Sequence, residues 1–183
     1  MRFNLSLASG IFEFEFKTFV KKALMLYQDD KGKSDHIQVS LQGGRLWFVF
    51  YVSNNKPGIT GRFNSEQKYN DFRWHSVRIE RNASITSFIV DHGTERKNFN
   101  TEGYLSSFDS TLLIGGFSLD QIINDVSNPD AFYLYATPLS KRGFFNACVR
   151  NVRYGKNDKN MTEVTDKYIE HNKIQKGCRL NDC

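Results

Sequence analysis

The sequence has little proline and little cysteine, and it contains no long apolar run. Only 3 of its 183 residues are proline and 13 are glycine, which excludes a collagen-like or low-complexity chain. No stretch approaches the ~20 consecutive apolar residues that a membrane-spanning helix needs. The first ten residues also lack the apolar core of a secretion signal. A chain of this length can bury a sizeable core, so we expect one main globular domain.

Histidine is scarce as well, and none of the histidines lies in a recognisable catalytic or metal-binding motif. The four are His36, His75, His92 and His171. His75 is followed by Ser76 and preceded by Asp71, which is the nearest approach to a catalytic group. Adjacent residues of a strand point to opposite faces of a sheet, so His75 and Ser76 cannot converge. We therefore predict that the protein is not an enzyme.

The three cysteines all lie in the last fifth of the chain, at Cys148, Cys178 and Cys183. A zinc site would need pairs of closely spaced ligands, and the only nearby imidazole is that of His171. A disulfide bond explains the cysteines better. Because any pairing leaves one thiol over, the sequence indicates that a cysteine-rich unit begins near its end.

The net charge is modest, at +5, and basic and acidic residues are intermixed. Short basic pairs such as Lys21 with Lys22 would attract a sulfated glycan weakly, although a solvated charged face explains them more simply. Nucleic-acid binding is disfavoured because the aromatic residues alternate as core positions instead of lying among exposed basic residues. Glycosylation motifs of the Asn-x-Ser/Thr type, which matter in a secreted chain, begin at Asn4, Asn82 and Asn160.

Aromatic residues are abundant, with 16 Phe and 8 Tyr, and they alternate with polar residues. From residue 11 to 17 every second residue is Phe, which is typical of a strand with one buried face. Gly43 and Gly44 separate two such segments and predict a hairpin. Trp74 is expected in the core, and residues 163–172 permit a short helix. The predicted strands are 11–17, 23–27, 37–41, 46–52, 74–80, 85–91, 111–114, 131–135 and 144–154. This pattern predicts an all-β fold, a two-sheet antiparallel sandwich.

Several local motifs follow one another in a distinctive order. They are ALMLY at 23–27, GGRL at 43–46, WHSV at 74–77, LIGG at 113–116 and FNACVRNV at 145–152. Together they resemble a laminin G domain, also called an LNS domain, over essentially the whole chain. The turn at 27–30 with Asp35 after it is most similar to neurexins. Residues 177–183 resemble the junction that leads from a first LNS domain into an EGF-like module. The resemblance thus implies an LNS domain over 1–178 and the start of an EGF-like module at 179–183.

The resemblance also implies a compartment and a function. It implies a jelly-roll sandwich in the extracellular part of a cell-surface adhesion receptor of the plasma membrane, with calcium-dependent protein binding at the synapse. A matrix module that binds sulfated glycans is the alternative. By the same resemblance, Cys148 pairs with Cys178 and Cys183 belongs to the next module.

A calcium site is the most specific consequence of the resemblance. It implies that the carboxylate of Asp35 and the backbone carbonyl of Val52 are ligands, with Asp109 or Ser107 as a further donor. A hairpin about Gly43 and Gly44 would bring Asp35 and Val52 together at its open end. So few protein ligands predict weak binding, in the extracellular range of roughly 10⁻⁴ to 10⁻³ M.

Overall fold

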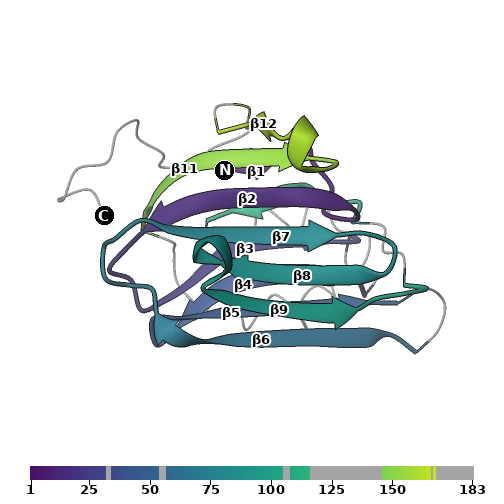
Figure 1. The fold of residues 1–183 in the computed structure, drawn as a ribbon, viewed down its shortest axis with the longest axis horizontal. Coiled ribbons are helices and arrows are strands. Elements are labelled where there is room, and N and C mark those ends of the chain that lie inside the picture. Colours follow the sequence, from purple (N-terminus) through teal and green to yellow (C-terminus); the bar gives the residue numbers. More distant parts are fainter. Residues whose placement is uncertain (32–33, 54–56, 105–107, 116–145, 166, 168–183) are drawn as a thin grey trace.

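The computed structural model describes residues 1–31, 34–53, 57–104, 108–115, 146–165 and 167, and the described part is an antiparallel β-sandwich (Figure 1). Two sheets of six strands face each other, and every strand pairing is antiparallel. Helical structure in the described part is limited to two 3₁₀ turns, η1 (Asp91–Gly93) and η2 (Asp158–Asn160). The predicted fold class is confirmed.

The strand order shows that the chain crosses between the two sheets several times. In the first sheet the order is β1 (Arg2–Phe3), β10 (Leu112–Ile114), β3 (Lys22–Asp29), β4 (His36–Gln42), β5 (Arg45–Val52) and β6 (Ile59–Lys68). In the second it is β12 (Thr162–Glu163), β11 (Cys148–Gly155), β2 (Gly10–Lys17), β7 (His75–Arg81), β8 (Ile85–Val90) and β9 (Glu95–Asn100).

The core lies between the sheets and is built largely from phenylalanine. On β2 the three phenylalanines expected inside from the alternation, Phe12, Phe14 and Phe16, are almost fully buried, and Ile11 at the start of the strand is buried as well. From the opposite sheet Phe48 stacks on Phe88 of β8, with 4.6 Å between ring centroids. Stacked and tilted aromatic pairs add to the stabilisation that burial alone provides. The period-2 pattern therefore determines which face of each strand enters the core.

The hairpin of β4 and β5 forms as predicted. Gly43 and Gly44 have φ angles of +61° and +84°, a pair of left-handed conformations that suits a two-residue turn. The register on either side pairs Gln42 with Arg45 and His36 with Tyr51. The segment therefore delivers residue 35 and residue 52 to the same end of the sandwich.

Two long edge strands, β6 and β9, were not predicted from the sequence. The buried positions of β6 include Gly61 and Ser65, which are small or polar, and β9 buries no residue fully. Ile59 and Phe63 of β6 and Phe99 of β9 do pack against the core, but they are too few and too widely spaced to give either strand a clear hydrophobic period. Their pairing with β5 and β8 selects the extended conformation. The short strands β1 and β12 were also missed.

The predicted end of the strand 23–27 and the predicted helix at 163–172 need correction, and part of the other predicted elements lies outside the described residues. Strand β3 continues through Gln28 and Asp29, because they pair with Ile37 and His36 of β4. The buried Gln28 side chain donates hydrogen bonds to the carbonyls of Leu5 and Ser110. The short helix expected from residue 163 does not begin there, because Glu163 ends β12. The described residues do not include the rest of that helix, at 166 and 168–172. They also do not include the predicted strand 131–135 or residues 144 and 145, which were predicted to begin the strand 144–154.

Trp74 is not in the core as expected. It is only partly buried and lies on the surface, where the guanidinium of Arg150 covers its ring at 3.9 Å from the centroid. Within the described ranges, no helix has the length and apolar character needed to cross a bilayer.

The sandwich has two ends, defined by the strand directions (Figure 1). We call the end where β3 stops, β4 starts and β5 stops the Asp35 rim; it is on the right in Figure 1. We call the other end, where β2 stops and β7 starts, the His75 end; it is on the left. A whole strand length separates the two.

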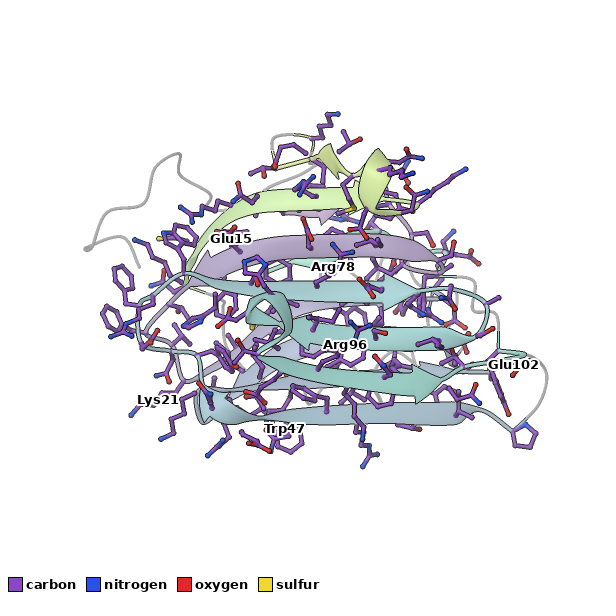
Figure 2. The ribbon with its side chains drawn as sticks, viewed as in Figure 1. Glu15, Lys21, Trp47, Arg78, Arg96 and Glu102 are labelled. Carbon is purple, nitrogen blue, oxygen red and sulfur yellow. The ribbon has the colours of Figure 1, made fainter. Side chains whose placement is uncertain are left out.

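The buried face of β5 should dominate stability. We expect Phe48→Ala to lower the free energy of unfolding by about 3–5 kcal/mol, because the cavity lies between the two sheets. The matched control is Trp47→Ala on the outer face of the same strand, where Figure 2 shows the side chain at the margin of the molecule. Chemical denaturation of both variants checks this expectation, and equal losses would contradict the assignment of faces.

Candidate functional site

The Asp35 rim places the first two predicted ligands side by side. His36 pairs with Tyr51, so the residues just outside that pair, Asp35 and Val52, face each other at the end of the hairpin. The Oδ1 atom of Asp35 accepts hydrogen bonds from the backbone N–H of Ser53 at 2.8 Å and from its hydroxyl at 2.9 Å. The expected convergence of Asp35 and Val52 is therefore present. Metal binding by these residues stays a prediction.

A turn with three buried carboxylates forms this rim. Asp29, Asp30 and Asp35 are each no more than 5% exposed. The Asp30 carboxylate accepts the backbone N–H groups of Ser34 and Asp35, and Asp29 accepts the hydroxyl of Tyr27. Every described hydrogen bond to the carboxylate of Asp35 ends on Oδ1. The second oxygen of Asp35 is thus the carboxylate atom of this turn that is best placed to accept a new ligand.

Burial is the largest electrostatic influence on the carboxylates of this rim. Burial raises the pKa of Asp35, and the nearby charge of Asp30 adds to that shift. The pKa of Asp29 is raised for the same two reasons. Arg81 is a cation near this rim; burial lowers its pKa to about 10 although the charge of Asp35 opposes that shift, and its guanidinium lies over the ring of Phe108 at 5.0 Å. An added cation would therefore stabilise the ionised form of Asp35.

The remaining predicted ligands are less well defined. Asp109 is exposed, and the next residue, Ser110, donates its backbone N–H to the carbonyl of Asp29 at 3.1 Å. The segment is thus attached to the acidic turn. Ser107 lies outside the described residues. In the part of the chain that the structure describes, no three acidic, histidine or cysteine side chains are grouped so that they could hold a metal ion. The donor set fits a hard cation only as an open site with one carboxylate and neutral oxygens.

Sequence reasoning selected Asp35 but missed the buried state of Asp29 and Asp30. Both were interpreted as residues of a turn that follows a buried strand, because aspartate is common in turns. A signal was available, since three aspartates within seven residues directly follow a fully apolar strand. Three carboxylates so close to a buried strand indicate either a strongly hydrogen-bonded turn or a cation site.

Of the predicted covalent sites in the described residues, Cys148 is buried and the three glycosylation motifs are exposed. Cys148 begins β11 and is disulfide-bonded, and its partner lies outside the described residues, as do Cys178 and Cys183. The pairing with Cys178 therefore stays a prediction. Asn4, Asn82 and Asn160 are all exposed, so their side chains are accessible to glycosylation. Their modification is also still a prediction.

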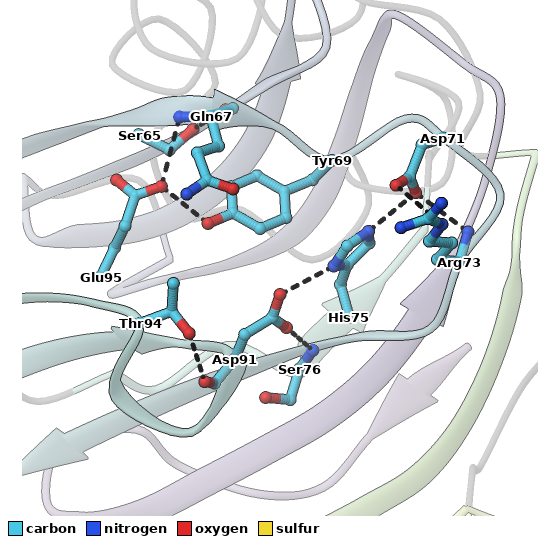
Figure 3. Close-up of polar contacts among 10 residues, drawn as sticks. All are labelled: Ser65, Gln67, Tyr69, Asp71, Arg73, His75, Ser76, Asp91, Thr94 and Glu95. Carbon is cyan, nitrogen blue, oxygen red and sulfur yellow. Dashed lines mark hydrogen bonds and ion pairs between the residues drawn. The ribbon is translucent and has the colours of Figure 1, made fainter.

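A second polar cluster lies at the His75 end (Figure 3). The Nδ1 atom of His75 is 2.8 Å from Oδ2 of Asp91, and its Nε2 atom is 2.8 Å from Oδ1 of Asp71. Ser76 contributes its backbone N–H, not its hydroxyl, to Asp91 at 2.7 Å. Because both ring nitrogens face carboxylates, His75 is not available as a general base for Ser76. The cluster ties the 3₁₀ turn after β8 to the loop before β7.

The geometry of His75 requires a charged ring. A neutral imidazole has one N–H and donates only one hydrogen bond, whereas both contacts here are to carboxylates. Burial lowers the pKa of His75, but the hydrogen bonds to Asp91 and Asp71 outweigh burial and raise it. For Asp71, burial acts to raise the pKa of the carboxyl, but the hydrogen bond from His75 and the other contacts outweigh burial, and the pKa of Asp71 is lowered overall. The three groups therefore stabilise the folded chain best when His75 is protonated and Asp71 is ionised.

This cluster makes stability depend on pH in a defined direction. The contribution of His75 should be complete below its unfolded pKa, about 6.5, and should be lost as the pH rises through the raised folded pKa. We expect His75→Gln to cost roughly 1–2 kcal/mol at pH 6 and clearly less at pH 9. Denaturation of the unmodified protein and of the variant at both pH values measures this difference.

The matched control is His92→Asn, at an exposed histidine of the next turn whose ring makes no described hydrogen bond. Asparagine suits the left-handed conformation of residue 92, where φ is +55°. This change should cost less stability at pH 6 than His75→Gln does, because it breaks no described hydrogen bond. A cost for His75→Gln that is the same at both pH values would contradict the charged bridge.

Comparisons with known proteins agree with this architecture. The chain is 30% identical over 113 residues to Neurexin-2 of Homo sapiens, covering 62% of this chain and 6% of that protein. It is 33% identical over 114 residues to Neurexin 1 of Drosophila melanogaster, covering 59% and 6%. It therefore spans only a small part of these relatives.

Among solved structures, laminin alpha1 domains LG4-5 from mouse superpose with a TM-score of 0.64 at 16% identity, covering 94% of this chain and 42% of that one. The LG1-3 region of the laminin alpha2 chain superposes with a TM-score of 0.60 at 17% identity, covering 80% and 27%. The family model described as "Laminin G domain" matches residues 16–157. The chain belongs to the laminin G domain family.

Proposed function

We propose that this laminin G domain is the extracellular ligand-binding module of a neurexin-like cell-surface receptor and mediates calcium-dependent protein adhesion, without catalysis. The observation that carries the proposal is that Asp35 lies beside Val52 at the end of the hairpin and that its Oδ2 atom accepts none of the described hydrogen bonds. Neurexins among the relatives support the receptor context. The synaptic location and the role of the whole protein belong to the same proposal.

The rim residues would hold the ion in a shallow site. The Asp35 carboxylate, which Ser53 orients through two hydrogen bonds, would be the charged ligand, and the carbonyl of Val52 would be a neutral one. Asp109 or Ser107 would add a further oxygen. A bound calcium ion supplies positive charge next to three buried carboxylates. Since calcium prefers 6–8 oxygens, carboxylates or carbonyls of a partner would complete the shell, which makes adhesion depend on calcium.

Calcium titration of the isolated chain tests this site. We expect weak binding, with a Kd of roughly 10⁻⁴ to 10⁻³ M, together with a rise in melting temperature at millimolar calcium. Asp35→Asn keeps the shape of the side chain but removes its charge, and it should abolish both signals. Isothermal titration and thermal unfolding provide the two readouts.

The matched control is Glu102→Gln, which removes one exposed carboxylate from the same end of the sandwich, where Figure 2 shows Glu102. Calcium binding should be unaffected by this change. Undiminished binding in Asp35→Asn, or no heat in the unmodified protein, would remove the site. If heparin retention instead persists without calcium and collapses in moderate salt, the sulfated-glycan function is the correct one.

We also propose that Cys148 pairs with Cys178, that the domain extends over 1–178 and that residues 179–183 begin an EGF-like module. Peptide mapping under non-reducing conditions should show a Cys148–Cys178 cross-link and an unpaired Cys183. Closure of this loop should stabilise the fold by about 3 kcal/mol, so Cys148→Ser should lower the unfolding free energy by that amount. A cross-link between Cys178 and Cys183 would contradict both the pairing and the boundary.

A further inference from the structure

The His75 end carries a group of aromatic and basic side chains that the proposed function does not use. We call it the aromatic platform and define it by Phe19, Phe72, Trp74, Lys17 and Arg150. Phe19 is 52% exposed, which makes it one of two large apolar side chains that the described structure leaves exposed. The platform lies a whole strand length from the Asp35 rim, at the end where Figure 2 shows Lys21 pointing away from the ribbon. It is therefore a separate surface.

The rings of the platform are stacked with one another and with cations. Phe19 and Phe72 are parallel, with an interplanar angle of 3° and 4.4 Å between centroids. The ammonium of Lys17 lies over the Phe72 ring at 4.5 Å, and the guanidinium of Arg150 lies over Trp74 at 3.9 Å. Cation–π contacts of this kind hold both the rings and the charges in place. The exposed apolar surface is thus contributed mainly by Phe19.

Backbone contacts from three loops keep the platform ordered. Thr18 is fully buried; its carbonyl accepts the backbone N–H of Phe72 at 3.1 Å, and its hydroxyl donates to the carbonyl of Asn146 at 2.6 Å. Phe72 has a φ of +62°, a conformation that a bulky residue adopts only when its surroundings impose it. The bridge from His75 to Asp71 fixes the residue before Phe72. The surface is therefore largely formed before any partner binds, which lowers the entropic cost of binding.

The charge around Phe19 is positive. Lys21 and Lys22 are exposed, and neither they nor Lys17 form an ion pair with a described carboxylate. The nearby acidic groups are already used, because Asp71 binds His75 and Arg73, and Glu15 binds Arg150. Uncompensated lysines around an exposed apolar ring favour a partner that brings negative charge.

We propose that the aromatic platform is a docking surface for a second protein, one that presents an apolar side chain flanked by carboxylates. An apolar centre with a charged rim is the usual composition of a protein interface, and Trp, Phe and Arg are enriched there. A sulfated glycan would meet the same lysines but is disfavoured, because Phe19, Lys17 and Arg150 already cover faces of Phe72 and Trp74 on which a sugar ring would stack. The docking needs no calcium.

The test uses the whole chain and a fluorescein-labelled synthetic peptide of 14 residues, in which Leu-Phe lies between runs of Asp and Glu. Fluorescence anisotropy should show saturable binding that weakens with added NaCl and is unchanged by EDTA. Phe19→Ala and the double variant Lys21→Glu/Lys22→Glu should each weaken binding at least about tenfold. A peptide with Ala in place of Leu-Phe should lose a similar factor, since charge alone is not the recognition element.

Two control variants match these changes at the opposite end. Ile85→Ala removes the other exposed large apolar side chain, which is 42% exposed, and Lys156→Glu/Lys159→Glu makes the same change in net charge on exposed lysines. Both should bind the peptide within a factor of two of the unmodified protein. All four variants change exposed residues, and their unfolding curves show whether the fold is intact.

Three results would overturn the proposal. One is the absence of saturable binding of the acidic peptide to the unmodified protein. Another is an equal loss in the two control variants. The third is that the peptide does not bind whereas a heparin oligosaccharide does, and that heparin binding is lost in the Lys21→Glu/Lys22→Glu variant. That result would make the surface a glycan site. Loss of calcium binding at Asp35 would leave this proposal unaffected, because the two surfaces share no residue.

Discussion

The packing of phenylalanines between the two sheets is the constraint on which the rest of this structure depends. Phe12, Phe14 and Phe16 enter the core from β2, and Phe48 meets Phe88 across the sheets. Side chains alternate between the faces of a strand, so a register slip of one residue would turn every one of these rings toward solvent. The core therefore fixes the register of each strand and, with it, the residues that arrive at each end of the sandwich.

The carboxylates at the two ends consequently have different partners. At the Asp35 rim, carboxylates are buried in one turn and rely on backbone N–H and hydroxyl donors. At the His75 end, the carboxylates form ion pairs with His75 and Arg150, and the lysines of the aromatic platform and its surroundings take part in none of the described ion pairs. A laminin G sandwich does not itself imply either arrangement, since function depends on the loops and not on the fold. One end suits a cation, and the other suits an anionic protein surface.

The His75 bridge shows how a residue with catalytic chemistry serves architecture. The imidazole of His75 is hydrogen-bonded to two carboxylates, which raise its pKa, and it thereby joins β7, the turn after β8 and the loop before β7. The Tyr69 ring packs edge-on against it, with 4.9 Å between ring centroids. Tyr69 in turn donates its hydroxyl to Glu95 at 2.7 Å (Figure 3). These contacts stabilise the loop that carries Phe72 and Trp74, so the polar cluster supports the aromatic platform beside it.

Local sequence patterns by themselves determined the all-β class, the central strands and the hairpin that brings Asp35 to Val52, because period-2 alternation and a Gly-Gly turn are local signals. Only the tertiary structure decided that β6 and β9 are strands, since their few inward apolar residues give no clear period and pairing with neighbouring strands selects their conformation. It also decided that Trp74 lies on the surface and that Asp91, 16 residues beyond His75, binds its ring. Burial, charge compensation and contacts between distant segments depend on how the sheets close on each other, and no local pattern encodes them.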